Sequence, residues 1–376
     1  MSTTSHRERI LSVFNGETVD QMPWVPRIDL WFNAQEARGT LPERFQGMQV
    51  EDIHRALDWP LHKIVPEFSR WKTKEDQLHF GIGLYNLKEY PATFAFSPDI
   101  DIRVRYDDGD GGEMTFVEYH TPVGMVRVSH GVTPEMKKGG ASIGWTKEHA
   151  IKGPEDYKTL TYLFSNLKIL PAYDRFLEWK ASIGDDGVAT AQGTGLACGS
   201  PIHFLQKQLV DPTDFYLHLK DYPKEMGELL EALGGMYDQL LEVLAGVEMD
   251  AILWMANVDD MLTYPDLYRD HFKPWCLKAS EILRPKGVNL VCHPDGENQG
   301  LMDLIRDSGM DVADAVAPWP MTKVRLEEYY QRWCVDGSLT IHGGIPETLL
   351  LPKSSTMDEL KDFMDHFFKA VAPGMR

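Results

Sequence analysis

Residues 288–298 read VNLVCHPDGEN, a mostly apolar run that leads directly into His293, Pro294 and Asp295. The apolar run predicts a buried strand, and Pro-Asp-Gly favours a turn after it. Histidine and aspartate also bind metals and transfer protons. Two interpretations are open at this point: an ordinary strand end with an exposed histidine, or one side of a catalytic site.

The second half of the chain alternates short apolar runs with helical patterns. Such alternation indicates βαβ units and a parallel sheet. Helices are predicted over Tyr222–Ala245 and over residues 354–371, where Thr356 and Glu359 form a capping-box pattern. The predicted strands are Met22–Leu30, Leu61–Pro66, Gly187–Thr190, Asp250–Met255, Val288–Cys292, Val312–Ala317 and Ser338–His342.

Residues 80–132 follow a different pattern, in which apolar and polar residues alternate around the Asp/Gly turn at Asp107–Gly112. Alternation on both sides of such a turn predicts an antiparallel hairpin or meander. Since no repeat or long linker divides the chain, we expect one barrel-like domain over residues 1–376 with a β subdomain inserted at 80–132.

Composition limits the partners. The net charge of −19 argues against nucleic acid and anionic membrane surfaces as partners. No apolar run approaches the length of a membrane span, and charges at Arg7, Glu8 and Arg9 argue against an export signal. The four cysteines are scattered without a CxxC pair, which suits a reducing cytoplasm. We expect a cytoplasmic protein that acts on a small neutral or weakly charged molecule.

An ordered set of segments resembles the uroporphyrinogen decarboxylase superfamily over nearly the whole chain. The resemblance implies a (β/α)8 barrel with its active site at the carboxyl ends of the strands. It would place a last strand just after AVAPG at 370–374. The segments are RERILSVFNGETVDQMPWVP (7–26), TPVG (121–124), YPDLYRDHFKPW (264–275), HPDG (293–296), GLMDLIRDSGMDVADAV (300–316) and HGGIPETLLLP (342–352).

Two branches of that superfamily differ in chemistry. Its decarboxylases have an arginine-rich first loop for a porphyrinogen's carboxylates, whereas the corresponding stretch here, VPRIDLWFNAQEARG, has only Arg27 and Arg38. The inserted β region and the TPVG turn resemble the cobalamin-dependent methyltransferases. That branch implies a methyl transfer that involves a corrinoid, and since no DxHxxG pattern is present, the corrinoid would arrive on a partner corrinoid protein.

Thiol-methylating members of this branch resemble one another in a His-x-Cys zinc site, and here Asp295 stands at the first cysteine position. A carboxylate is a harder ligand than a thiolate and leaves zinc a stronger Lewis acid. The resemblance therefore implies a zinc ion held partly by His293 and Asp295. The alternative is an acid, such as Asp295 or Asp259, that stabilises the phenolate as it forms. The implied reaction moves a methyl group from an oxygen donor, an aryl methyl ether, to cob(I)alamin.

Other residues at predicted strand ends are candidates for binding the small-molecule methyl donor. Asn257 and Asp259 follow a strand directly, and the alternative for each is a helix N-cap. His342 mirrors His293, and two histidines that end neighbouring strands would converge on one pocket. The remaining candidates are Trp24, Trp31, His203 and Trp319, for each of which packing is the alternative.

Two other activities stay open. A decarboxylase that acts on a smaller acid would use the same barrel without a corrinoid, and a methylcorrinoid:thiol methyltransferase would require a soft zinc site.

Overall fold

The computed structural model describes residues 4–65, 74–85, 89–109, 112–141, 144–351 and 353–371. The chain packs as two compact units. The terminal unit consists of Met1–Pro23 and Met249–Arg376, and the central unit consists of Trp24–Glu248. Among the helices of the described ranges, none is long and apolar enough to cross a bilayer.

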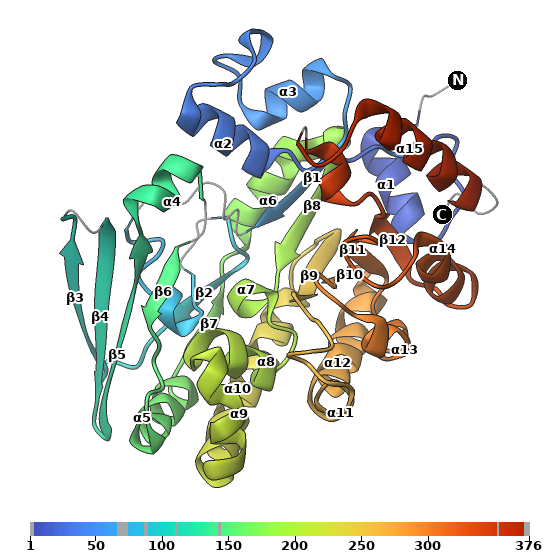
Figure 1. Ribbon diagram of the computed structural model, residues 1–376. Coiled ribbons are helices and arrows are strands. Elements are labelled where there is room, and N and C mark those ends of the chain that lie inside the picture. Colours follow the sequence, from blue (N-terminus) through green and yellow to red (C-terminus); the bar gives the residue numbers. More distant parts are fainter. Residues whose placement is uncertain are drawn as a thin grey trace. The chain divides into compact units, whose positions relative to one another are not determined.

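The terminal unit contains four parallel strands in the order β9-β10-β11-β12 (Figure 1). Helices connect successive strands, as the alternating pattern predicted. The strands are β9 (Ala251–Ala256), β10 (Asn289–His293), β11 (Val312–Val316) and β12 (Thr340–Gly343). The helices are α1 (His6–Phe14), α11 (Pro265–Leu267), α12 (Lys273–Leu283), α13 (Met302–Arg306), α14 (Leu326–Tyr329) and α15 (Met357–Val371).

Strand β9 is buried along its whole length and β10 along its first four residues, which is typical of parallel strands covered on both faces. All four strands of this unit agree with the sequence predictions to within two residues at each end. The capping box of α15 is also confirmed, since Thr356 N donates to Glu359 Oε2 (2.7 Å) and Glu359 N donates to Thr356 Oγ1 (3.2 Å).

The central unit contains a parallel pair, an antiparallel pair and an antiparallel sheet of four strands. The parallel pair is β1 (Leu61–Val65) with β8 (Gly187–Gln192), and the antiparallel pair is β2 (Ala92–Ala95) with β7 (Lys168–Pro171). The four-stranded sheet consists of β3 (Asp101–Asp107), β4 (Glu113–Thr121), β5 (Gly124–Val132) and β6 (Trp145–Glu148). The helices are α2 (Asp29–Arg38), α3 (Val50–Ala56), α4 (Pro134–Gly139), α5 (Pro154–Ser165), α6 (Tyr173–Ile183), α7 (Thr194–Ala197), α8 (Pro201–Phe204), α9 (Pro212–Asp221) and α10 (Pro223–Leu244).

The predicted antiparallel region is present. Strands β3 and β4 pair on either side of the Asp/Gly turn, of which residues 110 and 111 lie outside the described residues. In TPVG, Thr121 pairs with Gly124, so Pro122 and Val123 form a two-residue hairpin loop. The antiparallel sheet continues beyond residue 132 to β6, which pairs with β5. The single domain predicted over residues 1–376 and the inserted subdomain predicted over 80–132 stay predictions.

The strand predicted at Met22–Leu30 is wrong. Residues 22–28 form no strand, and α2 begins at Asp29. Pro23 and Pro26 explain the error, because proline lacks the amide hydrogen that a strand ladder requires.

The structure supports the mixed α/β class with parallel strands joined by helices. The closed eight-stranded barrel stays a prediction, and the strand expected after 370–374 lies outside the described residues.

Candidate functional site

The end of β10 brings the two principal candidate residues together. Residues Asn289–Cys292 are buried, and His293 is partly exposed. Asp295 N donates to His293 O (2.9 Å) across Pro294, which closes a three-residue turn. This turn places Asp295 Oδ2 3.9 Å from His293 Nε2. The local sequence therefore fixes a histidine and a carboxylate side by side at the carboxyl end of the strand.

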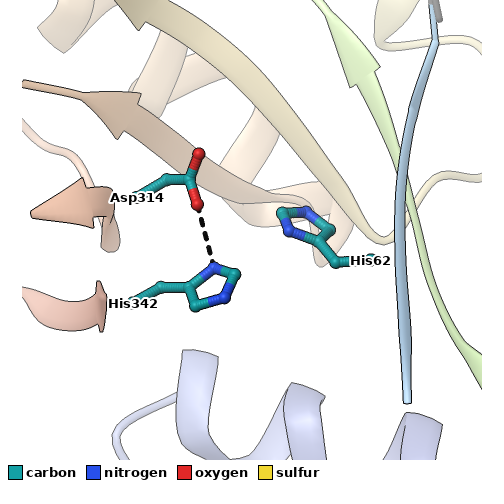
Figure 2. Close-up of side chains that lie close together, drawn as sticks. All are labelled: His62, Asp314 and His342. Carbon is teal, nitrogen blue, oxygen red and sulfur yellow. Dashed lines mark ion pairs between the residues drawn. The ribbon is translucent and has the colours of Figure 1, made fainter. Parts of the chain in front are cut away.

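A row of three polar residues crosses neighbouring strands of the terminal unit. Asp314 on β11 pairs in register with His342 on β12, and the pairing of Cys292 with Ala313 places His293 beside Asp314. His293 Nδ1 lies 3.0 Å from Asp314 Oδ2. His342 Nδ1 lies 2.9 Å from Asp314 Oδ1 (Figure 2). The two histidines thus contact opposite oxygens of a single carboxylate.

Asp314 is only 1% exposed. Burial alone would raise the pKa of its carboxyl, but the hydrogen bonds and charges of His293 and His342 outweigh burial and hold the pKa well below its usual value. A buried carboxylate without such partners would cost several kcal/mol. Asp314 is therefore an ionised hydrogen-bond acceptor within the sheet.

His293 and His342 were predicted to end neighbouring strands. This prediction is wrong, because β11 lies between β10 and β12. The two histidines are linked by Asp314 instead.

Hydrogen bonds tie the loops that follow β9, β10 and β11 to one another. Asn257 N donates to His293 O (2.8 Å), and Asp260 N donates to Glu297 O (2.6 Å). Glu297 Oε2 accepts from Lys323 N (2.8 Å), which connects the third loop. These contacts fix the surroundings of the His293–Asp295 pair.

Asp259, a candidate catalytic acid, caps a turn. Its Oδ1 accepts from Met261 N and Leu262 N, both at 2.9 Å. It is not a helix N-cap, since α11 begins only at Pro265. Asn257 has a left-handed backbone (φ 54°), an uncommon conformation that often occurs at functional positions. The catalytic role of Asp259 and the substrate-binding role of Asn257 stay predictions.

The candidate tryptophans are exposed. Trp319 of the terminal unit is 56% exposed, and Trp24 and Trp31 of the central unit are 49% and 38% exposed. Trp31 packs edge-on against Phe45, with ring centroids 6.3 Å apart. A role of these tryptophans in binding a substrate ring stays a prediction.

His203 lies in α8 of the central unit and is fully buried. Burial, together with the nearby charge of Lys207, holds the pKa of its imidazole well below the usual value. Its Nδ1 accepts a hydrogen bond from Gly199 N (3.1 Å). Contact between this side chain and a substrate would require movement of its surroundings, and the predicted role of His203 is untested.

The glycine-rich stretch before His203 lines a small cavity of the central unit. Gly193, Thr194 and Gly195 form one wall, and Tyr85, Tyr90 and Phe94 form the others. Gly195 has a left-handed backbone (φ 64°), which glycine adopts without strain.

Sequence reasoning missed Asp314 and His62. Asp314 stands within the apolar stretch VADAV, and His62 stands within the buried strand β1, where its Nε2 lies 2.9 Å from Thr190 Oγ1. Both are buried ionisable residues inside parallel strands. A buried ionisable residue requires a partner, which is the signal that could have found them.

The His293–Asp295 pair could supply two of the ligands of a zinc ion. In a tetrahedral zinc site a histidine nitrogen and a carboxylate oxygen lie about 3.4 Å apart. The 3.9 Å between Nε2 and Oδ2 would close to that value by a small rotation of the Asp295 side chain, which is 62% exposed. Nitrogen and oxygen ligands also suit zinc.

No protein-family model matches the chain, and no curated protein matches it. A solved structure of a methyltransferase from Methanosarcina mazei is similar over 92% of this chain and 94% of that chain. The two share 11% sequence identity with a TM-score of 0.45. A similarity this low supports no statement about the fold or the activity of this chain.

Proposed function

We propose that this protein is a methyltransferase that takes a methyl group from an oxygen donor, an aryl methyl ether, and passes it to cob(I)alamin on a partner corrinoid protein. The proposal includes a cytoplasmic location and a (β/α)8 barrel, both expected from the sequence. It rests on the sequence resemblance together with the arrangement at the end of β10.

The observation that carries the proposal is the His293–Asp295 pair. A histidine nitrogen and a carboxylate oxygen 3.9 Å apart can hold zinc with harder ligands than the thiolates of a thiol-methylating site. Such a site favours activation of an ether oxygen over activation of a sulfur atom. The buried Asp314 holds His293 in place from the opposite side of its ring.

In the proposed reaction the methyl–oxygen bond breaks and its electron pair stays on the oxygen. The bound zinc would supply Lewis-acid stabilisation of that oxygen. The corrinoid would supply the electron pair of the new cobalt–carbon bond, and solvent would supply the proton that the released phenolate takes up. His293 and Asp295 would hold the metal, and hydrogen bonds through Glu297 tie the loop that carries Asp295 to its two neighbouring loops.

The charge of the terminal unit supports a neutral donor. Asp259, Asp260, Asp295 and Glu297 lie on two loops joined by the hydrogen bond from Asp260 N to Glu297 O. Carboxylates grouped in this way repel an anionic substrate. A porphyrinogen with many carboxylates is therefore disfavoured, whereas an uncharged methoxyarene is not.

The test is the conversion of cob(I)alamin to methylcobalamin, followed by its absorption spectrum, across a panel of methoxylated aromatics with zinc-loaded protein. We expect turnover with at least one donor, and loss of turnover in His293→Ala and Asp295→Ala. Carbon dioxide release from an acid substrate would instead indicate the decarboxylase, and methylation of a thiol would indicate the thiol methyltransferase. If no methoxyarene in the panel reacts, the proposal fails.

A further inference from the structure

The hydrogen bonds around Asp314 fix how His293 presents its ring. An ionised carboxylate only accepts hydrogen bonds. Since Asp314 Oδ2 lies 3.0 Å from His293 Nδ1, this nitrogen must carry the hydrogen. In the neutral ring, Nε2 then has a lone pair, and Nε2 is the atom on the side of Asp295.

His342 holds Asp314 from the other side. Its Nδ1 lies 2.9 Å from Asp314 Oδ1 (Figure 2). Together with the His293 contact at Oδ2, the carboxylate is held at both oxygens. The three residues occupy one row across β10, β11 and β12, and the strand ladder sets their spacing. A side chain that is 1% exposed and bonded at both ends has little freedom to rotate.

We propose that Asp314, held by His342, is a positioning residue that directs the Nε2 lone pair of His293 toward a zinc ion shared with Asp295. This inference rests on the proposed function for the use of the metal. Its geometric part stands independently, because it concerns which ring nitrogen carries the hydrogen.

The chemistry of replacement makes the inference testable. In Asp314→Asn the amide oxygen accepts one hydrogen bond while the amide nitrogen donates, so the side chain no longer accepts from both histidines. Loss of a carboxylate that orients a metal-bound histidine lowers metal affinity about 10–100-fold. His342→Gln leaves Asp314 in place and should cause a smaller loss.

The experiment uses the full chain and measures zinc affinity by competition with a chelator, together with ¹⁵N NMR of the histidine rings in the zinc-free protein. We expect the wild type to have its His293 hydrogen on Nδ1, and Asp314→Asn to lose this preference and to bind zinc about 10–100-fold more weakly. The matched control is Asp311→Asn, one residue before the same strand, whose carboxylate instead contacts Arg284 and Leu290 N. The control should keep the zinc affinity of the wild type.

Circular dichroism would verify that each variant is folded. The inference is overturned if folded Asp314→Asn keeps its zinc affinity within twofold, if the wild-type hydrogen lies on Nε2, or if the wild type binds no zinc. Methyl transfer is measured separately. A protein whose zinc affinity depends on Asp314 but which demethylates no ether would retain the positioning role and lose the proposed function.

Discussion

Arg7 and Asp250 form a bidentate ion pair that joins the first helix of the terminal unit to the start of β9. Arg7 Nη2 lies 2.8 Å from Asp250 Oδ1, and Nη1 contacts Oδ2. The side chain of Asp250 is only 3% exposed, so its charge depends on this partner. Among the side chains, only the planar guanidinium of arginine offers two parallel N–H donors that match a carboxylate.

Arg7→Ala should destabilise the protein by about 3 kcal/mol, because it removes the arginine from an ion pair with a buried carboxylate. Arg9 on the same helix is the matched control, since it pairs with Asp20, whose side chain is 55% exposed. Arg9→Ala should cost less than about 1 kcal/mol. Urea unfolding of both variants measures the difference, and equal losses would contradict the prediction.

Gly343→Ala should destabilise the protein by roughly 1–3 kcal/mol, because it forces a side chain into a strained backbone. Gly343 has φ 132°, and an added Cβ would lie 2.6 Å from Val316 N. Gly235 in α10 is the control, since an added Cβ there meets nothing within 4 Å. Gly235→Ala should stabilise by roughly 0.5–1 kcal/mol. The midpoint temperatures of thermal unfolding of the two variants should shift in opposite directions from that of the wild type.

Acid should weaken the central unit through two buried histidines. Burial lowers the pKa of His79 to about 4, with the charge of His130 contributing, and burial lowers the pKa of His130 to about 4. The unfolded chain binds these protons near pH 6.5, so between pH 6.5 and 4 the unfolded state binds more protons and stability falls as the pH falls. At pH 5 each histidine should lower the free energy of unfolding by roughly 1–2 kcal/mol relative to pH 7.

The measurement is urea unfolding at pH 7 and at pH 5, for the wild type and for His130→Leu. The variant lacks one of the two titrating groups, so its stability should fall less between the two pH values. An unchanged pH dependence would show that His130 is not buried in its neutral form.

Asp295→Cys should convert the metal site to the softer His-x-Cys type. A thiolate beside His293 should raise zinc affinity and reduce the Lewis acidity of the ion. Methyl transfer from an aryl ether should then fall at least about tenfold, a loss of 1.4 kcal/mol of transition-state stabilisation. Cobalt(II) substitution should add a sulfur-to-cobalt absorption band in the variant only. Undiminished ether cleavage by the cysteine variant would argue against a role for the hard ligand.

Much of the secondary structure followed from periodicity. The strands of the terminal unit were predicted because their apolar runs are bounded by turn residues, and α10 and α15 because their leucines and phenylalanines recur at helical spacing. The strand predicted at Met22–Leu30 is absent, because Pro23 and Pro26 lack the amide hydrogens that a strand ladder requires. Local patterns were sufficient where each element depends on its own residues.

The candidate site was only half predictable. His293 and Asp295 are joined by one turn, so their proximity follows from adjacent residues. Asp314 contacts His293 although the two residues lie 21 positions apart in the sequence. It was missed because no local pattern specifies which side chains face one another on paired strands. This information is contained in the strand order and register.

The row of His293, Asp314 and His342 depends on the hydrogen-bond ladder of three strands. Deleting or inserting a single residue within β11 would turn Asp314 to the opposite face and leave both imidazoles without their common anion. Length changes in the helices between the strands would leave the row intact. Natural variants of this chain should therefore tolerate altered lengths outside the sheet while retaining an invariant count of residues inside it.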